Sequence, residues 1–272
     1  MKKILLFTDL DGTLLDANNY SFSAAQDAIH ALAGLKIPII PCTSKTHLEV
    51  ISTQECMGIS DPFIVENGSA IFFKKNYFDT NDSKIIEMDN YKALVLGSLY
   101  KDVLDFFGNW KSQYNLSVTG LHEMSIQKIM ALTGLNYHEA EIAQKRFFSE
   151  PFTLNDDDNL PDNALNDLIV NKFRLLIGNR FYHLLGNSDK GIAVKKLIDL
   201  FKDKWKTNNL ITIGIGDSMN DLEMLKSVDK PVLVKKPGGS HQEGIELENL
   251  LYTNEIGPAG WQEAVFNFLD KV

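Results

Sequence analysis

The chain has 272 residues, of which 44% are hydrophobic and 23% charged, a composition typical of a folded protein with room for two domains. Its formal net charge of −9 argues against nucleic acid as a main partner, because binding to a phosphate backbone needs a basic surface. No stretch approaches the roughly 20 apolar residues of a membrane-spanning helix. Because the two cysteines cannot form a disulfide framework in a chain of this length, we expect a cytoplasmic location.

The first part of the chain alternates strand-like and helix-like patterns. We predict strands at 4–8, 37–41 and 62–65, and helices at 24–35 and 46–57. Glu66-Asn67-Gly68 is a tight-turn signal, and residues 69–73 read as the returning strand of a hairpin. Strands that alternate with helices indicate a parallel sheet with helices on both faces.

The middle of the chain loses this alternation. It contains predicted helices near 98–115 and 137–148 and predicted strands at 172–177 and 181–185. The acidic run at 155–158 lacks the glycine and the twelfth-position glutamate of a calcium-binding loop, so we predict a solvated turn there. This mixture of predicted helices and strands without regular alternation favours an inserted α+β domain.

The alternation resumes after the insertion, with a helix at 190–200, a strand at 210–215, a helix near 219–227 and a strand at 231–234. We therefore predict an α/β fold. Its core is a doubly wound parallel sheet built from residues 1–83 and 188–272, and residues 84–187 form the inserted α+β domain.

Acidic side chains follow the first predicted strand. Asp9 and Asp11 are two residues apart, so in an extended strand both carboxylates point to the same side. Two neighbouring carboxylates repel each other, and the pair therefore calls for a cation or a proton between them. Ligands bind at the carboxyl ends of the strands in open α/β sheets, which is where this pair lies.

Three further polar segments follow predicted strands or begin helices. They are Cys42-Thr43-Ser44-Lys45-Thr46, Asp189-Lys190-Gly191 and Gly216-Asp217-Ser218-Met219-Asn220-Asp221. Together with Asp9 to Thr13 they resemble, in type and in order, the four motifs of the haloacid dehalogenase superfamily of phosphoryl-transfer enzymes. Each segment alone is a weak signal, whereas all four in order are a specific one.

The resemblance implies a role for each matching residue. Asp9 would be the nucleophile that forms an aspartyl-phosphate, and Asp11 the general acid and then the base. Mg²⁺ would be held by the carboxylates of Asp9 and Asp217 and the backbone carbonyl of Asp11, with Asp221 as a nearby ligand or support. The remaining contacts to the phosphoryl group are implied for Thr43, the amide of Ser44, Lys190 and Asn220.

Two of these residues also have plainer readings. Lys190 could be a surface lysine in the first turn of a helix, although a cation there opposes the helix dipole. Thr43 could cap the helix that follows, a role open to Ser44 and Thr46 as well.

The position of the insertion resembles the type-C2 cap of this superfamily, and Glu66-Asn67-Gly68 resembles its Cof-type branch. Several stretches further resemble the mannosyl-3-phosphoglycerate phosphatase family: residues 7–16, 42–46, 132–135, 146–152 and 180–185. This resemblance implies a substrate with a phosphate, a carboxylate and many hydroxyls. It also implies substrate contacts from Ser44, Lys45, Asn67, Thr133, Gly134, Arg146, Glu150 and Asn220.

The cap residues leave alternatives open. Arg146 and Glu150 are four residues apart and could share a helix face, with Arg146 binding the carboxylate and Glu150 the sugar hydroxyls. They could equally be a surface ion pair worth tenths of a kcal/mol. Gly134 could simply end a helix, and His183 is expected to be a structural histidine.

We predict a Mg²⁺-dependent phosphatase that converts mannosyl-3-phosphoglycerate to mannosylglycerate through an aspartyl-phosphate. The alternatives are a phosphatase acting on glucosyl-3-phosphoglycerate or sucrose phosphate, a phosphohexomutase, and a non-catalytic phosphate-binding regulator. The expected partner is a small phosphorylated sugar acid, with neither nucleic acid nor a membrane as partner.

Overall fold

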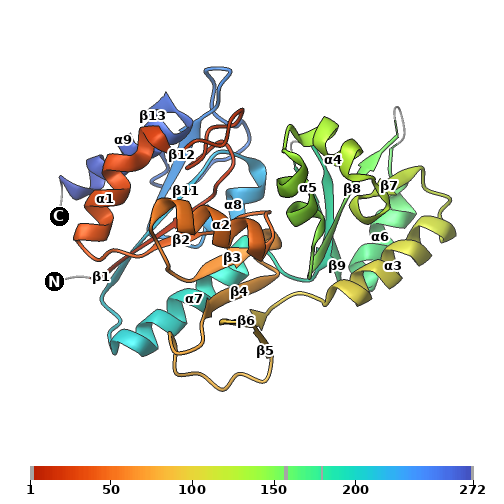
Figure 1. Cartoon of the computed structure of the whole chain (residues 1–272), viewed down its shortest axis with the longest axis horizontal. Helices are drawn as coiled ribbons and strands as arrows, with labels where there is room; N and C mark the ends of the chain where they lie inside the picture. Colours follow the sequence, from red (N-terminus) through yellow and green to blue (C-terminus); the bar gives the residue numbers. More distant parts are fainter. Residues whose placement is uncertain (1–2, 156–158, 179, 271–272) are drawn as a thin grey trace.

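A five-stranded parallel sheet forms the centre of the protein, seen here in a computed structural model that describes residues 3–155, 159–178 and 180–270 (Figure 1). The strand order is β13-β12-β11-β1-β2, and all neighbouring pairs are parallel. The strands are β1 (Lys3–Thr8), β2 (Ile39–Pro41), β11 (Leu210–Gly216), β12 (Lys230–Lys235) and β13 (Leu251–Ile256). The predicted parallel α/β core is confirmed.

Helices cover both faces of this sheet because side chains alternate along β1. Ile4 and Leu6 pack in one buried cluster with α1 (Gln26–Gly34) and α9 (Gly257–Leu269). Leu5 and Phe7 pack in a second cluster with α7 (Lys190–Trp205) and α8 (Leu222–Leu225). The remaining helix of this part is α2 (His47–Met57), and short 3₁₀ turns lie at η1 (Ser23–Ala25), η2 (Glu66–Gly68) and η4 (Met219–Asp221).

A second sheet is antiparallel, with the order β3-β4-β6-β5. Its strands are β3 (Phe63–Val65), β4 (Ala70–Lys74), β5 (Ile85–Met88) and β6 (Tyr91–Val95). The hairpin expected across Glu66-Asn67-Gly68 is present as β3 and β4. Because β5 and β6 belong to this sheet, their pairing favours a cap that begins near Gly97 rather than at residue 84. The division into core and cap stays a prediction.

A third sheet, β7-β8-β10-β9, is antiparallel and lies in the middle segment. The helices α3 and α6 contribute to one buried cluster with it, and α4 and α5 belong to another. The elements are β7 (Val118–Gly120), β8 (Ser149–Leu154), β9 (Phe173–Ile177), β10 (Tyr182–Gly186), α3 (Tyr100–Gln113), η3 (Leu121–Glu123), α4 (Ile126–Thr133), α5 (Tyr137–Gln144) and α6 (Asp162–Val170). Figure 1 shows α5 on the side of this segment that faces α2 of the core, and the two helices are in contact.

The predicted helix at 137–148 is wrong at its C-terminal end. Helix α5 ends at Gln144, and residues 149–154 form β8 instead. The amides of Phe147 and Phe148 donate to the carboxylate of Glu66, so this stretch gains its hydrogen bonds from the core rather than from a helix. Arg146 and Glu150 therefore do not share a helix face.

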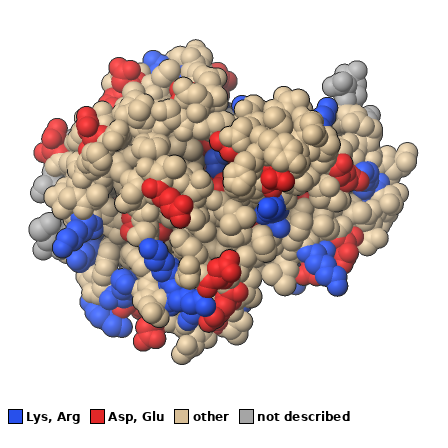
Figure 2. All heavy atoms as spheres, in the orientation of Figure 1, with Lys and Arg blue, Asp and Glu red and all other residues tan. Residues whose placement is uncertain are grey.

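The two chain connections between core and cap run side by side. A Cβ atom on Gly186 would come within 2.5 Å of the Ser98 backbone nitrogen, and one on Gly97 within 2.9 Å of the Ser188 hydroxyl. The predicted turn at 155–158 falls on residues 156–158, which lie outside the described residues. Of the helices in the described part of the chain, none is long and apolar enough to cross a membrane. Figure 2 shows Lys and Arg side chains scattered among Asp and Glu over the face drawn.

Candidate active site

A cavity of about 680 Å³ opens where the carboxyl ends of the central strands face the cap. Residues of both parts line it. The predicted site residues in its lining are Asp9, Asp11, Ser44, Lys45, Thr133, Arg146, Asp217 and Asn220. The structure thus brings together segments that lie far apart in the sequence.

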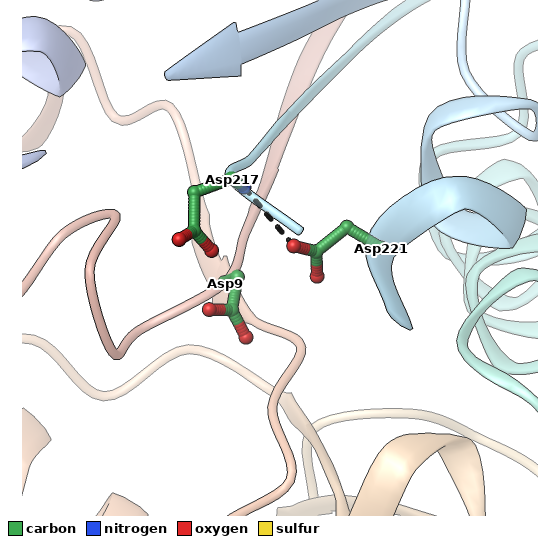
Figure 3. A group of neighbouring side chains, drawn as sticks. All are labelled: Asp9, Asp217 and Asp221. Atoms are coloured by element: carbon green, nitrogen blue, oxygen red, sulfur yellow. Dashed lines mark hydrogen bonds between the residues drawn. The ribbon is translucent and has the colours of Figure 1, made fainter. Parts of the chain in front are cut away.

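Three carboxylates meet at the core side of this cavity (Figure 3). Asp9 follows β1 and Asp217 follows β11, and these strands are parallel neighbours, so their ends lie at the same edge of the sheet. Asp221 is in the η4 turn after β11 and accepts hydrogen bonds from the amides of Asp217 and Ser218, at 3.0 and 3.1 Å. Carboxylate oxygens of Asp9, Asp217 and Asp221 lie within 4.8 Å of one another, and all three residues are buried.

Lys190 provides the positive charge in this cluster. Its ammonium lies 2.7 Å from an Asp9 oxygen and 2.6 Å from an Asp221 oxygen. Burial alone would lower the pKa of Lys190, but the two carboxylates more than offset this and raise it. Lys190 is 1% exposed, which rules out the surface-lysine reading.

One ammonium does not balance three buried carboxylates. Burial raises the pKa of Asp9 well above its ordinary value although Lys190 opposes the shift, and burial together with Asp221 raises the pKa of Asp217 to about 7. Gly12 has φ of +83°, and a Cβ atom there would lie 2.9 Å from Asp217, so glycine leaves room for this carboxylate. A group of oxygen donors with excess negative charge fits a hard divalent cation.

Asp11 stands apart from this cluster. Its side chain is 40% exposed, lines the cavity, and pairs with the Lys45 ammonium at 3.1 Å. Lys45 is held from its other side by Glu49, at 3.4 Å. Asp11 therefore faces the space that a substrate would fill, whereas Asp9 lies on the floor of the site.

The loop between β2 and α2 supplies the predicted phosphate contacts. Thr46 caps α2 in a capping box with Glu49, so Thr43 is not the cap. The Thr43 hydroxyl accepts from the Lys45 amide at 3.2 Å, and the residue is buried outside the cavity lining, whereas Ser44 is part of that lining. Ser44 therefore borders the cavity, and the choice between Thr43 and Ser44 as the main phosphate contact stays a prediction.

Comparison with known proteins agrees with this geometry. The family profile described as haloacid dehalogenase-like hydrolase matches residues 6–174 and 181–237. The chain belongs to the haloacid dehalogenase-like hydrolases. The resemblance to this family and the expected enzyme class, a phosphatase, are thereby confirmed.

Full-length relatives of this hydrolase have names that state an activity. It is 35% identical over 269 residues to a glucosyl-3-phosphoglycerate/mannosyl-3-phosphoglycerate phosphatase of Methanococcoides burtonii, covering 99% of this chain and 98% of that relative. It is 36% identical over 271 residues to a protein of the same name from Persephonella marina, with coverage of 99% and 98%.

Solved structures share the fold of the hydrolase at low sequence identity. A Thermoplasma acidophilum protein superposes with a TM-score of 0.67 at 18% identity, covering 99% of both chains. The sucrose-phosphatase of Synechocystis, solved with sucrose and phosphate, superposes with a TM-score of 0.64 at 14% identity, covering 98% of both.

The cap side of the hydrolase's cavity contains two of the predicted substrate-binding residues, Thr133 and Arg146. Arg146 is 7% exposed and donates to the Ser44 carbonyl at 2.8 Å. Gly134 ends α4 in a left-handed conformation, as the plainer reading expected, and is not part of the lining. His183 lies in the lining, and burial lowers its pKa to about 3.

Glu150 and Asn67 lie outside the lining. Glu150 is fully buried within the cap, where its carboxylate contacts His122 Nδ1 at 2.8 Å and accepts from the Tyr100 hydroxyl at 2.6 Å. These contacts tie β8 to Tyr100 and His122, and substrate binding by Glu150 stays a prediction. Asn67 is fully buried, and its side-chain amide has no hydrogen-bond partner among the described residues.

The sequence reasoning missed one residue of this site, Tyr20, and one residue beside it, Glu66. Tyr20, in a core loop, donates its hydroxyl to the Thr133 carbonyl at 3.2 Å and accepts from Arg180 at 3.0 Å, and all three residues line the cavity. Glu66 joins the core to the cap segment around Arg146. Arg180 and Glu66 lie in the stretches that carried the family resemblance, whereas Tyr20 sits in a polar loop without a recognisable signal.

Proposed function

We propose that this hydrolase is a Mg²⁺-dependent phosphatase that removes the phosphate of a glycosyl-3-phosphoglycerate. The observation that carries the proposal is the placement of Asp9, paired with the buried Lys190, on the floor of a cavity that Asp11 also lines. The names of the full-length relatives support both a mannosyl and a glucosyl substrate. We retain mannosyl-3-phosphoglycerate as the expected substrate and the glucosyl compound as the alternative.

The reaction needs a nucleophile and a proton donor. A carboxylate oxygen of Asp9 attacks phosphorus while the bond from phosphorus to the glycerate oxygen breaks, giving an aspartyl-phosphate. Asp11 gives its proton to the leaving oxygen, then accepts a proton from the water that hydrolyses the aspartyl-phosphate and releases inorganic phosphate. The arriving phosphate competes with Asp11 for the Lys45 ammonium, which lies 3.1 Å from that carboxylate.

Lys190 keeps Asp9 in place and offsets negative charge during transfer. Asp9, Asp217 and the backbone carbonyl of Asp11 would hold Mg²⁺, and the bound ion would supply further positive charge beside the phosphoryl group. Both carboxylate oxygens of Asp221 already accept hydrogen bonds, one from Lys190 and the other from the 217–218 amides. We therefore assign Asp221 to orienting these groups.

The cap provides contacts for the rest of the substrate. We propose that Arg146 binds the glycerate carboxylate and that Thr133 and Asn220 contact hydroxyl or phosphoryl oxygens. The cavity of about 680 Å³ is in the range of ligand pockets of roughly 300–1,000 Å³ and exceeds what a phosphate alone would need.

Cys42 and Cys56 are both free thiols, which supports the proposed cytoplasmic location.

The test is phosphate release from mannosyl-3-phosphoglycerate, glucosyl-3-phosphoglycerate, sucrose 6-phosphate and mannose 6-phosphate, each with Mg²⁺ and with EDTA. We expect a Mg²⁺-dependent preference for a phosphoglycerate substrate of about 100-fold, or roughly 2.7 kcal/mol of transition-state discrimination. Equal, slow rates on all four would contradict the substrate assignment. Isomerised sugar phosphate without free phosphate would instead identify a mutase.

Replacing Asp9 with asparagine tests the chemistry. We expect Asp9→Asn to lower turnover by at least about 10³-fold, because the amide is not a nucleophile, while circular dichroism stays unchanged. Asp27→Asn, in the exposed first turn of α1, is the matched control and should keep full activity. Substantial turnover by Asp9→Asn would refute the aspartyl-phosphate mechanism.

A further inference from the structure

The buried carboxylate of Glu66 joins the core to the cap. One of its oxygens accepts from the Phe147 amide at 3.0 Å. The other accepts from the Phe148 amide at 3.1 Å and from the Ser149 hydroxyl at 2.7 Å, and lies 3.3 Å from Arg146 Nε. Four successive cap residues thus contact a single core side chain.

These contacts exist only while the cap is docked. Glu66 is fully buried, and a buried carboxylate is tolerated only when it is paired and hydrogen-bonded. All four of its side-chain partners come from the segment 146–149. If that segment moved away, the carboxylate would lose these partners and would have to be solvated by water instead. The carboxylate therefore favours one position of the cap over others.

The turn that carries Glu66 is attached to the catalytic floor. The Glu66 amide donates to the Lys45 carbonyl at 3.0 Å, and the Asn67 amide donates to the Thr43 carbonyl at 2.9 Å. Gly68 packs so closely on the backbone between Asp189 and Lys190 that a Cβ atom there would lie 2.1 Å from the Asp189 carbonyl oxygen. The turn thus contacts both the phosphate loop and the start of α7.

On the cap side, the same junction fixes a cavity residue. The Arg146 guanidinium lies against Glu66 and donates to the Ser44 carbonyl at 2.8 Å and to the Ser149 hydroxyl at 2.9 Å. Arg146 lines the cavity, and so does Ser44. A displacement of Glu66 would therefore move the side chain of a residue that lines the cavity.

We propose that Glu66 is a positioning residue that holds the cap closed and sets the Arg146 guanidinium at the cavity wall. It contacts neither the reacting atoms nor the cavity, and acts through Arg146 and the 146–149 segment. The prediction for catalysis rests on the proposed function. The prediction for cap docking does not.

Other contacts between core and cap are weaker candidates for this role. Arg174 of β9 pairs with Asp189, but its side chain is 36% exposed, and exposed ion pairs contribute little. The hydrogen bond from Tyr20 to the Thr133 carbonyl joins two neutral groups, and in the one from Arg180 to Tyr20 only the donor is charged. The Glu66 junction combines full burial with four donors from one segment.

The test compares Glu66→Gln with Ser149→Ala on two substrates. Gln keeps the size of the side chain but loses the charge and turns an amide group toward donors of the 146–149 segment. We expect Glu66→Gln to raise KM for the preferred glycosyl-3-phosphoglycerate at least about 10-fold. Hydrolysis of p-nitrophenyl phosphate, a phosphate monoester without a carboxylate for Arg146 to bind, should stay within about 3-fold of the wild-type rate.

Ser149→Ala removes one hydrogen bond and should shift KM in the same direction by a smaller factor. KM of the Glu66→Gln and Ser149→Ala double variant should exceed that of Glu66→Gln only slightly, because both substitutions affect the same group of hydrogen bonds around the side chain of residue 66. Ser112→Ala is the matched control, since it removes a hydroxyl that donates to the Gly108 carbonyl in an exposed turn of α3, and it should leave both substrates unaffected.

Hydrogen exchange measures docking without turnover. The Phe147 and Phe148 amides should exchange at least about 10-fold faster in Glu66→Gln than in the wild type, and Ser112→Ala should leave them unchanged. An equal loss of activity on both substrates, or unchanged exchange at these amides, would overturn the proposal. Faster exchange in a protein that hydrolyses no glycosyl-3-phosphoglycerate would support the docking role and reject the proposed function.

Discussion

Replacing Gly68 with alanine tests whether the turn at 66–68 sets the position of Lys190. Gly68 has φ of +93°, and an added Cβ atom would lie 2.1 Å from the Asp189 carbonyl oxygen and 2.6 Å from the Lys190 nitrogen. Gly58, the C-cap of α2, provides a matched control. It has φ of +69°, but a Cβ atom there would meet no atom within 4 Å.

The two substitutions share one cost and differ in another. Placing a non-glycine residue in the left-handed region costs about 1–2 kcal/mol at either site. At Gly68 the backbone must also move apart by roughly 1 Å, and such overpacking costs about 1–3 kcal/mol more. We therefore expect Gly68→Ala to lower the free energy of unfolding by about 2–5 kcal/mol and Gly58→Ala by about 1–2 kcal/mol.

The displacement should also be visible in catalysis. Lys190 begins α7 and contacts Asp9, so a shift of its backbone moves the ammonium relative to the nucleophile. A misplacement of about 1 Å can cost roughly 10²-fold in rate. We expect kcat of Gly68→Ala to fall by about that factor and kcat of Gly58→Ala to stay at the wild-type value.

Urea unfolding gives the two stability changes, and Mg²⁺-dependent phosphate release gives the two rates. Equal losses of stability for Gly68→Ala and Gly58→Ala would refute the packing argument. A stability loss at Gly68 without a fall in kcat would refute the link to Lys190.

Two further changes test other parts of the structure. Burial raises the pKa of Asp61 to about 6 from 3.8, so its charged form destabilises the native state as pH rises through 6. The free energy of unfolding of Asp61→Asn, measured with urea, should therefore exceed that of the wild type by an amount that grows from pH 4 to pH 7.5, up to about 3 kcal/mol. A difference that stays constant across that range would contradict this reasoning. Tyr20→Phe removes the hydroxyl that bridges Thr133 and Arg180. Because one hydrogen bond contributes about 0.5–1.5 kcal/mol, KM for the phosphoglycerate substrate should rise about 2- to 12-fold if this bridge sets the cavity wall. An unchanged KM would show that the bridge does not aid binding.

The parallel core and the floor of the site follow from patterns in the sequence. The apolar runs that end in Asp9 and Asp217 predict buried parallel strands, and the carboxyl ends of such strands meet at one edge of a sheet. Lys190 was found through the resemblance of its segment to a family motif at the start of a predicted helix, and its ammonium lies beside Asp9. These residues could be found because each follows a local pattern whose geometry is nearly fixed.

The contacts between distant segments depend on how the chain packs in three dimensions. The partners of Glu66 are 80 to 83 residues away along the chain, and those of Tyr20 are 113 and 160 residues away. The local pattern predicted a helix through residue 148. It could not show that the carboxylate of Glu66, from the core, accepts hydrogen bonds from the amides of Phe147 and Phe148. Local periodicity reports the face that a segment buries, whereas the docking of the cap depends on which buried groups find partners across the interface.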